Sequence, residues 1–187
     1  MSVTTEVAFD TEREFEVVDG KPEEKEMGKA RHGGVGLRLG ARMWFHAEEH
    51  QLGGVYGPDT TFLIGQNERL PDIAFVSAAR IPPEGEPDDI WRLAPDLAVE
   101  VISSNDLWEK VTRKVRDYFA AGVRQVWLIS LENKEVMIYH TPTQSVILME
   151  EDELTAEELL PGFRCPVSEL FRQPAHSEQP AHSEQPA

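Results

Sequence analysis

The sequence has little cysteine and no long apolar stretch. Its single cysteine, Cys165, excludes an intramolecular disulfide and a cysteine-built zinc site, and it suits a reducing compartment. No apolar run approaches the roughly 18 residues that a membrane-spanning helix needs. The first residues also lack the basic and apolar regions of a signal peptide. We therefore expect a cytoplasmic protein.

Basic residues are also scarce. The chain has 18 Lys and Arg against 34 Asp and Glu, so its formal net charge is −16 at pH 7. A field of this sign repels polyanions, which excludes nonspecific coating of nucleic acid. The sequence concentrates basic residues in two predicted helical segments, 29–42 and 110–124. A nucleic acid is therefore expected to bind only where these segments converge.

Several catalytic motifs are missing as well. The sequence has no P-loop lysine motif, no G-x-S-x-G motif and no complete dinucleotide-binding fingerprint. His46 and His50 match the H-x-x-E-H pattern of zinc proteases, with Glu49 as the acid. Gly53 and Gly54 follow closely and end the predicted helix, which leaves little support for a rigid zinc site. A zinc hydrolase is thus a disfavoured alternative.

The apolar content is sufficient for one core. With 187 residues, 40% of them hydrophobic, the composition is that of a globular protein of one domain. We expect a single domain over residues 1–172. Residues 173–187 contain a repeat of Pro-Ala-His-Ser-Glu-Gln and are predicted to be a disordered low-complexity tail, because such a segment cannot offset the entropy cost of ordering.

The order of predicted elements is that of a mixed α/β domain. Residues 14–20 alternate in polarity and end in Asp-Gly, which is typical of a hairpin. Apolar residues recur at helical spacing over residues 30–50. Asp106 and Glu109 have the spacing of a capping box, which would start a second helix near Leu107 and let it run to Ala121. Strands are predicted at residues 60–64, 73–76, 97–102, 125–130, 135–140 and 145–150. The expected fold class is α/β (α+β), with helices flanking a mixed central sheet.

An acid inside an apolar strand is the feature that most needs an explanation. Glu100 interrupts the otherwise apolar residues 97–102. A buried, ionised carboxylate costs several kcal/mol unless it pairs with a cation or binds a metal, and otherwise it is protonated. Strand alternation places Glu100 on one face with Ala98 and Ile102. Glu100 is therefore expected to point at a specific partner.

A second acid has similar surroundings. Asp72 follows a proline and begins the apolar strand 73–76. Two carboxylates from adjacent strands form the oxygen-rich site that Mg²⁺ or Mn²⁺ prefers, and the carbonyl of Val101 is a candidate additional ligand. For Asp72 or Glu100 taken alone, a structural ion pair or a cap remains an equal alternative.

A basic stripe follows the Glu100 strand. Lys114 lies one helical turn after Lys110 and one turn before Tyr118, so the three share a helix face. A helix packed beside the Glu100 strand would bring the Lys114 ammonium to the carboxylates. A solvated basic face is the alternative for this stripe.

These residues resemble a known family, the Uma-type restriction endonucleases of the PD-(D/E)XK nuclease superfamily. The resemblance runs from about residue 15 to residue 139 and leaves the acidic end segments and the tail outside. Its motifs are residues 14–20, His32, and residues 70–76, 94–106 and 114–128, in the family's order. Ile102 is a departure, because the superfamily pattern expects lysine there.

The resemblance implies a restriction-endonuclease-like core and Mg²⁺- or Mn²⁺-dependent hydrolysis of phosphodiester bonds in nucleic acid, DNA being favoured. It places Asp72 and Glu100 on the family's two acids, and Lys114 on a lysine that the family supplies from the following helix. Glu16 and His32 match further positions near the site, with undecided roles and a structural hydrogen bond favoured for His32. The resemblance also suggests a homodimer, as do exposed strands such as residues 135–140.

A second function class stays open at this point. The chain could keep the nuclease fold yet act as a catalytically inactive binding or assembly module, because a fold does not prove an activity. The strongly acidic net charge supports this alternative. Metal uptake and cleavage distinguish the two classes, since a pure binding module is indifferent to metal.

Overall fold

A six-stranded mixed sheet forms the centre of the molecule. The computed structural model describes residues 15–25, 29–103 and 106–174. The strand order is β10-β9-β8-β7-β6-β3, in which only β7 and β8 are parallel neighbours. The bounds are β3 (Gly53–Tyr56), β6 (Ile73–Ser77), β7 (Leu97–Ile102), β8 (Gln125–Ser130), β9 (Glu135–Thr141) and β10 (Gln144–Leu148). The predicted mixed sheet is confirmed.

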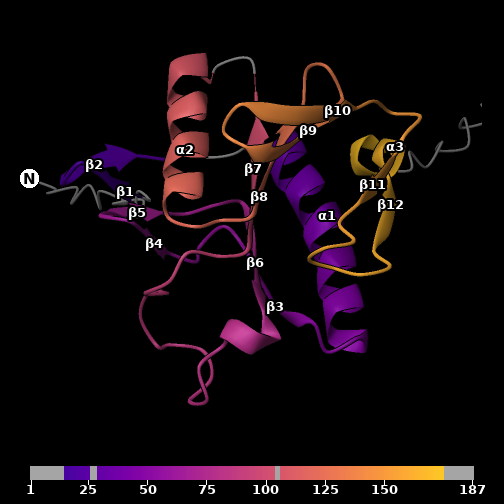
Figure 1. Ribbon diagram of the computed structural model, residues 1–187. Helices are drawn as coiled ribbons and strands as arrows, with labels where there is room; N and C mark the ends of the chain where they lie inside the picture. The colour runs from indigo at the N-terminus through magenta and orange to yellow at the C-terminus, as the bar shows by residue number, and fades with distance from the viewer. Residues whose placement is uncertain (1–14, 26–28, 104–105, 175–187) are drawn as a thin grey trace, which may run out of the picture.

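One long helix covers each face of this sheet (Figure 1). Helix α1 (Ala30–Glu49) packs its buried stripe on the face that carries Val99 and Val101. Helix α2 (Trp108–Ala120) packs on the opposite face, together with Ala98. Side chains on the two faces of β7 thus belong to two separate hydrophobic cores, because successive side chains of a strand point to opposite faces of the sheet. Glu100 lies on the α2 side because it alternates in step with Ala98.

A smaller antiparallel sheet lies beside α2 (Figure 1). Its order is β2-β1-β5-β4, with bounds β1 (Phe15–Val18), β2 (Lys21–Glu24), β4 (Phe62–Ile64) and β5 (Asn67–Arg69). The predicted Asp-Gly hairpin joins β1 to β2, where Asp19 has φ 51° and Gly20 φ 73°. Positive φ at both turn residues is the geometry that favours this dipeptide. The small sheet carries further charged residues toward α2.

The acidic C-terminal segment of the domain completes the α1 side. It contains β11 (Glu153–Thr155), β12 (Arg164–Pro166) and α3 (Val167–Phe171). Elsewhere in the chain, a short 3-10 helix, η1 (Ala78–Arg80), follows β6. The sequence did not predict these short elements. Leu154, Leu160 and Leu170 are fully buried and belong to the core under α1. The segment is therefore part of the domain, despite its acidity.

Two sequence expectations are wrong in detail. The N-cap of α2 is Leu107, which makes no side-chain cap, and Asp106 instead accepts hydrogen bonds from the amide and hydroxyl of Ser103. Asp106 therefore does not form the predicted capping box. Strand β9, residues 135–141, is no exposed edge, because β10 pairs with it on its outer side. The predicted disordered tail lies, from residue 175 onward, outside the described residues.

In the part of the chain that the structure describes, no helix combines the length and apolar character needed to cross a lipid bilayer.

Candidate active site

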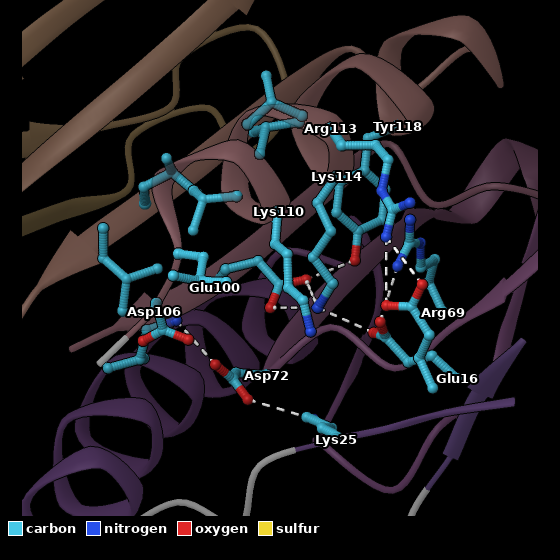
Figure 2. A pocket seen from close by; sticks show the side chains of 18 of the residues that line it. Glu16, Lys25, Arg69, Asp72, Glu100, Asp106, Lys110, Arg113, Lys114 and Tyr118 are labelled. Carbon is cyan, nitrogen blue, oxygen red and sulfur yellow. Dashed lines mark hydrogen bonds and ion pairs between the residues drawn. The ribbon is translucent and has the colours of Figure 1, made fainter. Parts of the chain in front are cut away.

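A cavity of about 160 Å³ lies where α2, the β6–β7 pair and the small sheet meet. Charged residues from all these elements line it, and Figure 2 shows them from close by. We call it the site cavity. Its charged and phenolic lining residues are Glu16, Glu23, Glu24, Lys25, His32, Arg69, Asp72, Glu100, Asp106, Lys110, Arg113, Lys114 and Tyr118.

Asp72 lies on the wall of the site cavity between Lys25 and His32. Its carboxylate is 3.3 Å from Lys25 Nζ and 3.2 Å from His32 Nε2, and it accepts the Val101 amide at 2.7 Å. The ladder pairs Ile73 with Val99, so Asp72, one residue earlier, is placed beside Glu100. Val101 therefore fixes Asp72 through its N–H, a contact that the sequence did not predict.

Glu100 is held by two groups of α2. The Lys114 ammonium lies 3.0 Å from each carboxylate oxygen, and the Tyr118 hydroxyl donates to Oε1 at 2.6 Å. Lys114 and Tyr118 are one helical turn apart, so a single face of α2 supplies both contacts. Figure 2 shows Lys110 extending from the same helix toward this carboxylate. The structure thus brings Asp72, Glu100 and Lys114 to one cavity.

A buried anchor supports Lys114 from the side of the small sheet. Lys114 also donates to Glu16 at 2.8 Å, and Glu16 accepts Arg69 Nη1 at 2.8 Å and the Leu70 amide at 3.2 Å. Arg69 continues to Asp117 on α2 through its second terminal nitrogen. Arg69 is only 2% exposed. Glu16 thus positions the Lys114 ammonium. The sequence analysis did not identify Arg69 or Asp117 as residues of the site.

The two central acids experience opposite electrostatic environments. Complete burial raises the pKa of Glu100 above its ordinary value; the Lys114 charge opposes this rise, while that of Asp72 adds to it. Burial would also raise the pKa of Asp72, but the hydrogen bond from His32 and the charges of Lys25 and His32 hold it below its ordinary value. Perturbed pairs of this kind are typical of functional sites, though ion-pair networks produce them too.

Two cationic groups near these acids also have shifted pKa values. The hydrogen bond to Asp72 raises the pKa of His32, against its burial. Burial would lower the pKa of Lys114, but the charges of Glu100 and Glu16 raise it well above its ordinary value. Lys114 is therefore an ammonium at neutral pH, a hydrogen-bond donor with no capacity to accept a proton.

The donors of the site suit a hard divalent cation. Carboxylates and carbonyls are the ligands that Mg²⁺ and Mn²⁺ prefer, and Asp72 and Glu100 present carboxylates to the same cavity from adjacent strands. Within residues 15–25, 29–103 and 106–174, no group of three or more His, Cys, Asp and Glu side chains is arranged to hold a metal. A cation here would thus rest on two acids, with backbone, water and substrate oxygens completing its ligands.

The basic segments converge only in part. Lys110, Arg113 and Lys114 line the site cavity. On α1, however, Arg38 donates to the Leu170 carbonyl at 2.8 Å and Arg42 pairs with Glu169 at 3.0 Å, so both attach α1 to α3. The basic half of α1 therefore serves the fold at these two positions.

The H-x-x-E-H pattern has a structural role. His46 Nε2 is 2.9 Å from the Pro161 carbonyl, His50 Nδ1 is 2.9 Å from the His46 carbonyl, and the two rings stack at 4.3 Å. These contacts close the end of α1, and the two histidines belong to no metal-holding group among the described residues.

Comparisons with known proteins bear on this site. The model of the Uma2 family, described as "Putative restriction endonuclease", matches residues 4–168. The match therefore includes the acidic segment after residue 150, which the sequence analysis had left outside the resemblance. A crystal structure from Anabaena variabilis, described as a putative nuclease, superposes with a TM-score of 0.78 at 21% identity, covering 86% of this chain and 91% of that chain. No curated protein matches.

Proposed function

This chain belongs to the Uma2 family, and from that premise we propose that it is a metal-dependent endonuclease that hydrolyses phosphodiester bonds of nucleic acid, DNA in particular. One observation carries the proposal: the Lys114 ammonium lies 3.0 Å from Glu100 in a cavity that Asp72 also lines. An acid pair with an adjacent fixed cation is the arrangement that stabilises charge on a reacting phosphate.

In this proposal Asp72 and Glu100 hold one Mg²⁺ or Mn²⁺, with the Val101 carbonyl as a further ligand. When bound, such an ion supplies a water of lowered pKa and neutralises phosphate charge. The low pKa of Asp72 keeps its carboxylate ionised for this task. The Lys114 ammonium, 3.0 Å from both oxygens of Glu100, opposes the rise in pKa that burial causes there.

Lys114 acts as a fixed hydrogen-bond donor. Its ammonium lies between Glu100 and Glu16, and the contact with Glu16 at 2.8 Å fixes it there (Figure 2). A donor fixed before reaction costs no reorganisation when negative charge grows on the phosphate, and one such donor typically contributes about 3 kcal/mol. No covalent intermediate is needed. His32, hydrogen-bonded to Asp72, is a positioning residue in this scheme.

The rim of the cavity supports a phosphate-bearing substrate. Lys25, Lys110 and Arg113 line the cavity as further cations, although Arg113 is also paired with Glu23 at 2.9 Å. Since the whole chain has a net charge of −16, the contact with a polyanion is expected to involve few phosphates, so its affinity should depend only weakly on salt.

The test combines metal binding and cleavage. Purified protein is titrated with Mn²⁺ by calorimetry and then incubated with plasmid DNA, single-stranded DNA and RNA. We expect saturable Mn²⁺ binding and strand cleavage, both lost in Asp72→Asn and in Glu100→Gln. Asp89→Asn is the matched control, because its carboxylate pairs with Arg92 on the surface. If wild-type protein binds nucleic acid but neither binds Mn²⁺ nor cleaves DNA or RNA, the protein is a catalytically inactive binding module.

The exposed edge of the central sheet supports a homodimer. Strand β10 is the outermost strand, and Val146 and Ile147 on it are 50% and 53% exposed. An unpaired edge with apolar side chains is a template for pairing with another chain. We expect light scattering to give a dimer for wild-type protein and a monomer for Ile147→Lys, and a wild-type monomer contradicts this assignment.

A further inference from the structure

A second hollow adjoins the site cavity. It has a volume of about 390 Å³ and runs along α1 beside β3, which is an edge strand of the central sheet. We call it the α1 groove. Its lining residues are His32, Gly33, Gly36, Leu37, Gly40, Ala41, Trp44, Val55, Tyr56, Gly57, Pro58, Asp72 and Ile73.

Two residues lie between the α1 groove and the candidate active site. His32 and Asp72 line both hollows. Asp72 is the acid held at 3.2 Å by His32 and at 2.7 Å by the Val101 amide. A strand whose phosphate lies in the site cavity would therefore cross His32 and Asp72 to place a base in the groove.

The chemistry of the groove differs from that of the site cavity. Apart from the two shared residues, its side chains are apolar or aromatic, and no lysine or arginine lines it. Trp44 is 46% exposed, so the face of a large ring is available to a ligand. A flat apolar surface with an aromatic ring suits a nucleobase, because every base has a π-face that can stack. Phosphates find their cations in the site cavity instead.

A base within a duplex cannot fill such a groove. It is stacked and paired, so it must be single-stranded or extruded before it can enter a pocket on a protein. The net charge of −16 also disfavours the long backbone contact that recognition of a duplex requires. Both considerations favour a strand with unpaired nucleotides.

We propose that the α1 groove binds an unpaired nucleobase of the nucleic acid strand whose phosphate lies in the site cavity, an inference that rests on the proposed nuclease function. Trp44 supplies the stacking surface, and His32 and Asp72 lie between the base and the phosphate. The preferred substrate is accordingly a single strand or a duplex with an unpaired nucleotide.

Gly36 offers a way to fill the groove without disturbing the fold. A Cβ at this helical position meets no atom within 4 Å. Both alanine and leucine favour a helix over glycine by up to about 1 kcal/mol, so neither change weakens α1. Gly36→Leu fills the groove, whereas Gly36→Ala adds one methyl group.

The experiment measures binding of a fluorescent 12-nucleotide DNA single strand and of its duplex by anisotropy, with Ca²⁺ in place of Mg²⁺. We expect wild-type protein to prefer the single strand. Trp44→Ala and Gly36→Leu are expected to weaken single-strand binding about five- to 150-fold, the range of one lost stacking contact. Gly36→Ala should have a smaller effect than Gly36→Leu. Met149→Ala, at an exposed apolar side chain that lines neither hollow, is the control and should bind as wild type.

Other outcomes overturn the inference in distinguishable ways. If wild-type protein cleaves DNA but Gly36→Leu binds single strands as tightly as wild type, the groove inference fails and the nuclease function stands. If Gly36→Leu turns a wild-type dimer into a monomer in light scattering without weakening DNA binding, the groove belongs to a second copy. If wild-type protein neither binds nor cleaves nucleic acid, both proposals fail together.

Discussion

The buried anchor under Lys114 allows a quantitative stability test. Replacing Arg69 with methionine removes the cation that contacts Glu16 at 2.8 Å and Asp117, while largely preserving the side-chain volume. The Arg69 side chain is 2% exposed and that of Glu16 is 8% exposed, so solvent cannot compensate for the lost charge. Removing one partner of such a pair costs about 3–5 kcal/mol, because Lys114 alone then compensates the charges of both Glu16 and Glu100.

This cost is measurable by denaturation. For a domain of this size, 1 kcal/mol corresponds to about 2–4 °C in Tm, so Arg69→Met should lower Tm by about 6–20 °C. Circular dichroism at pH 7, by heating and by urea, gives both Tm and the free energy of unfolding.

A matched variant shows whether burial is the cause. Arg113 pairs with Glu23 at 2.9 Å, yet its side chain is 40% exposed. Arg113→Met should therefore cost less than about 1 kcal/mol. Adding Glu16→Gln to Arg69→Met should recover part of the loss, since one uncompensated charge then disappears. Equal losses for Arg69→Met and Arg113→Met would refute the reasoning.

Three further predictions concern pH, reactivity and metal affinity. Burial would raise the pKa of Glu16, but the charges and hydrogen bonds of Lys114 and Arg69 hold it below its ordinary value. Ionised Glu16 therefore stabilises the fold above about pH 4, and this stabilisation is lost as the pH falls through the folded pKa. The difference in unfolding free energy between wild type and Glu16→Gln should accordingly shrink below about pH 4. The Cys165 side chain is fully buried and burial raises its pKa, so Ellman's reagent should react only after unfolding, and reaction in the native state would contradict this packing. Lys25→Met removes a cation 3.3 Å from Asp72 and should tighten Mn²⁺ binding about fivefold in calorimetry, whereas weaker binding would mean that Lys25 does not compete with the metal.

The central strand illustrates what a sequence can predict. Once residues 97–102 are assigned to a strand, Glu100 is assigned to a face before any coordinates, because the period of a strand is fixed by its backbone. Lys114 and Tyr118 follow from helical periodicity in the same way. That α2 packs over Glu100 is the step that periodicity alone could not supply, and it came from the resemblance to a family.

Long-range partners explain most of what was missed. Arg69 contacts Glu16 across 53 residues and Asp117 across 48, and nothing local marks an arginine as buried. The only local signal was its position just before Leu70 and Asp72, in a segment that the resemblance already included. Likewise, β10 covers β9 through pairing of strands whose exposed side chains look like those of an edge.

The charged cluster divides into a part that holds the fold and a part that can respond to a ligand. Arg69 with Asp117, and Lys114 with Glu16, form pairs between the small sheet and α2 that need no outside ion. The carboxylate of Asp72 is instead contacted by Lys25 and His32, whose side chains are 14% and 21% exposed. A cation that binds at Asp72 can therefore displace Lys25 without breaking the buried pairs. Stability and metal affinity should accordingly respond to different substitutions, the first to Arg69→Met and the second to Lys25→Met.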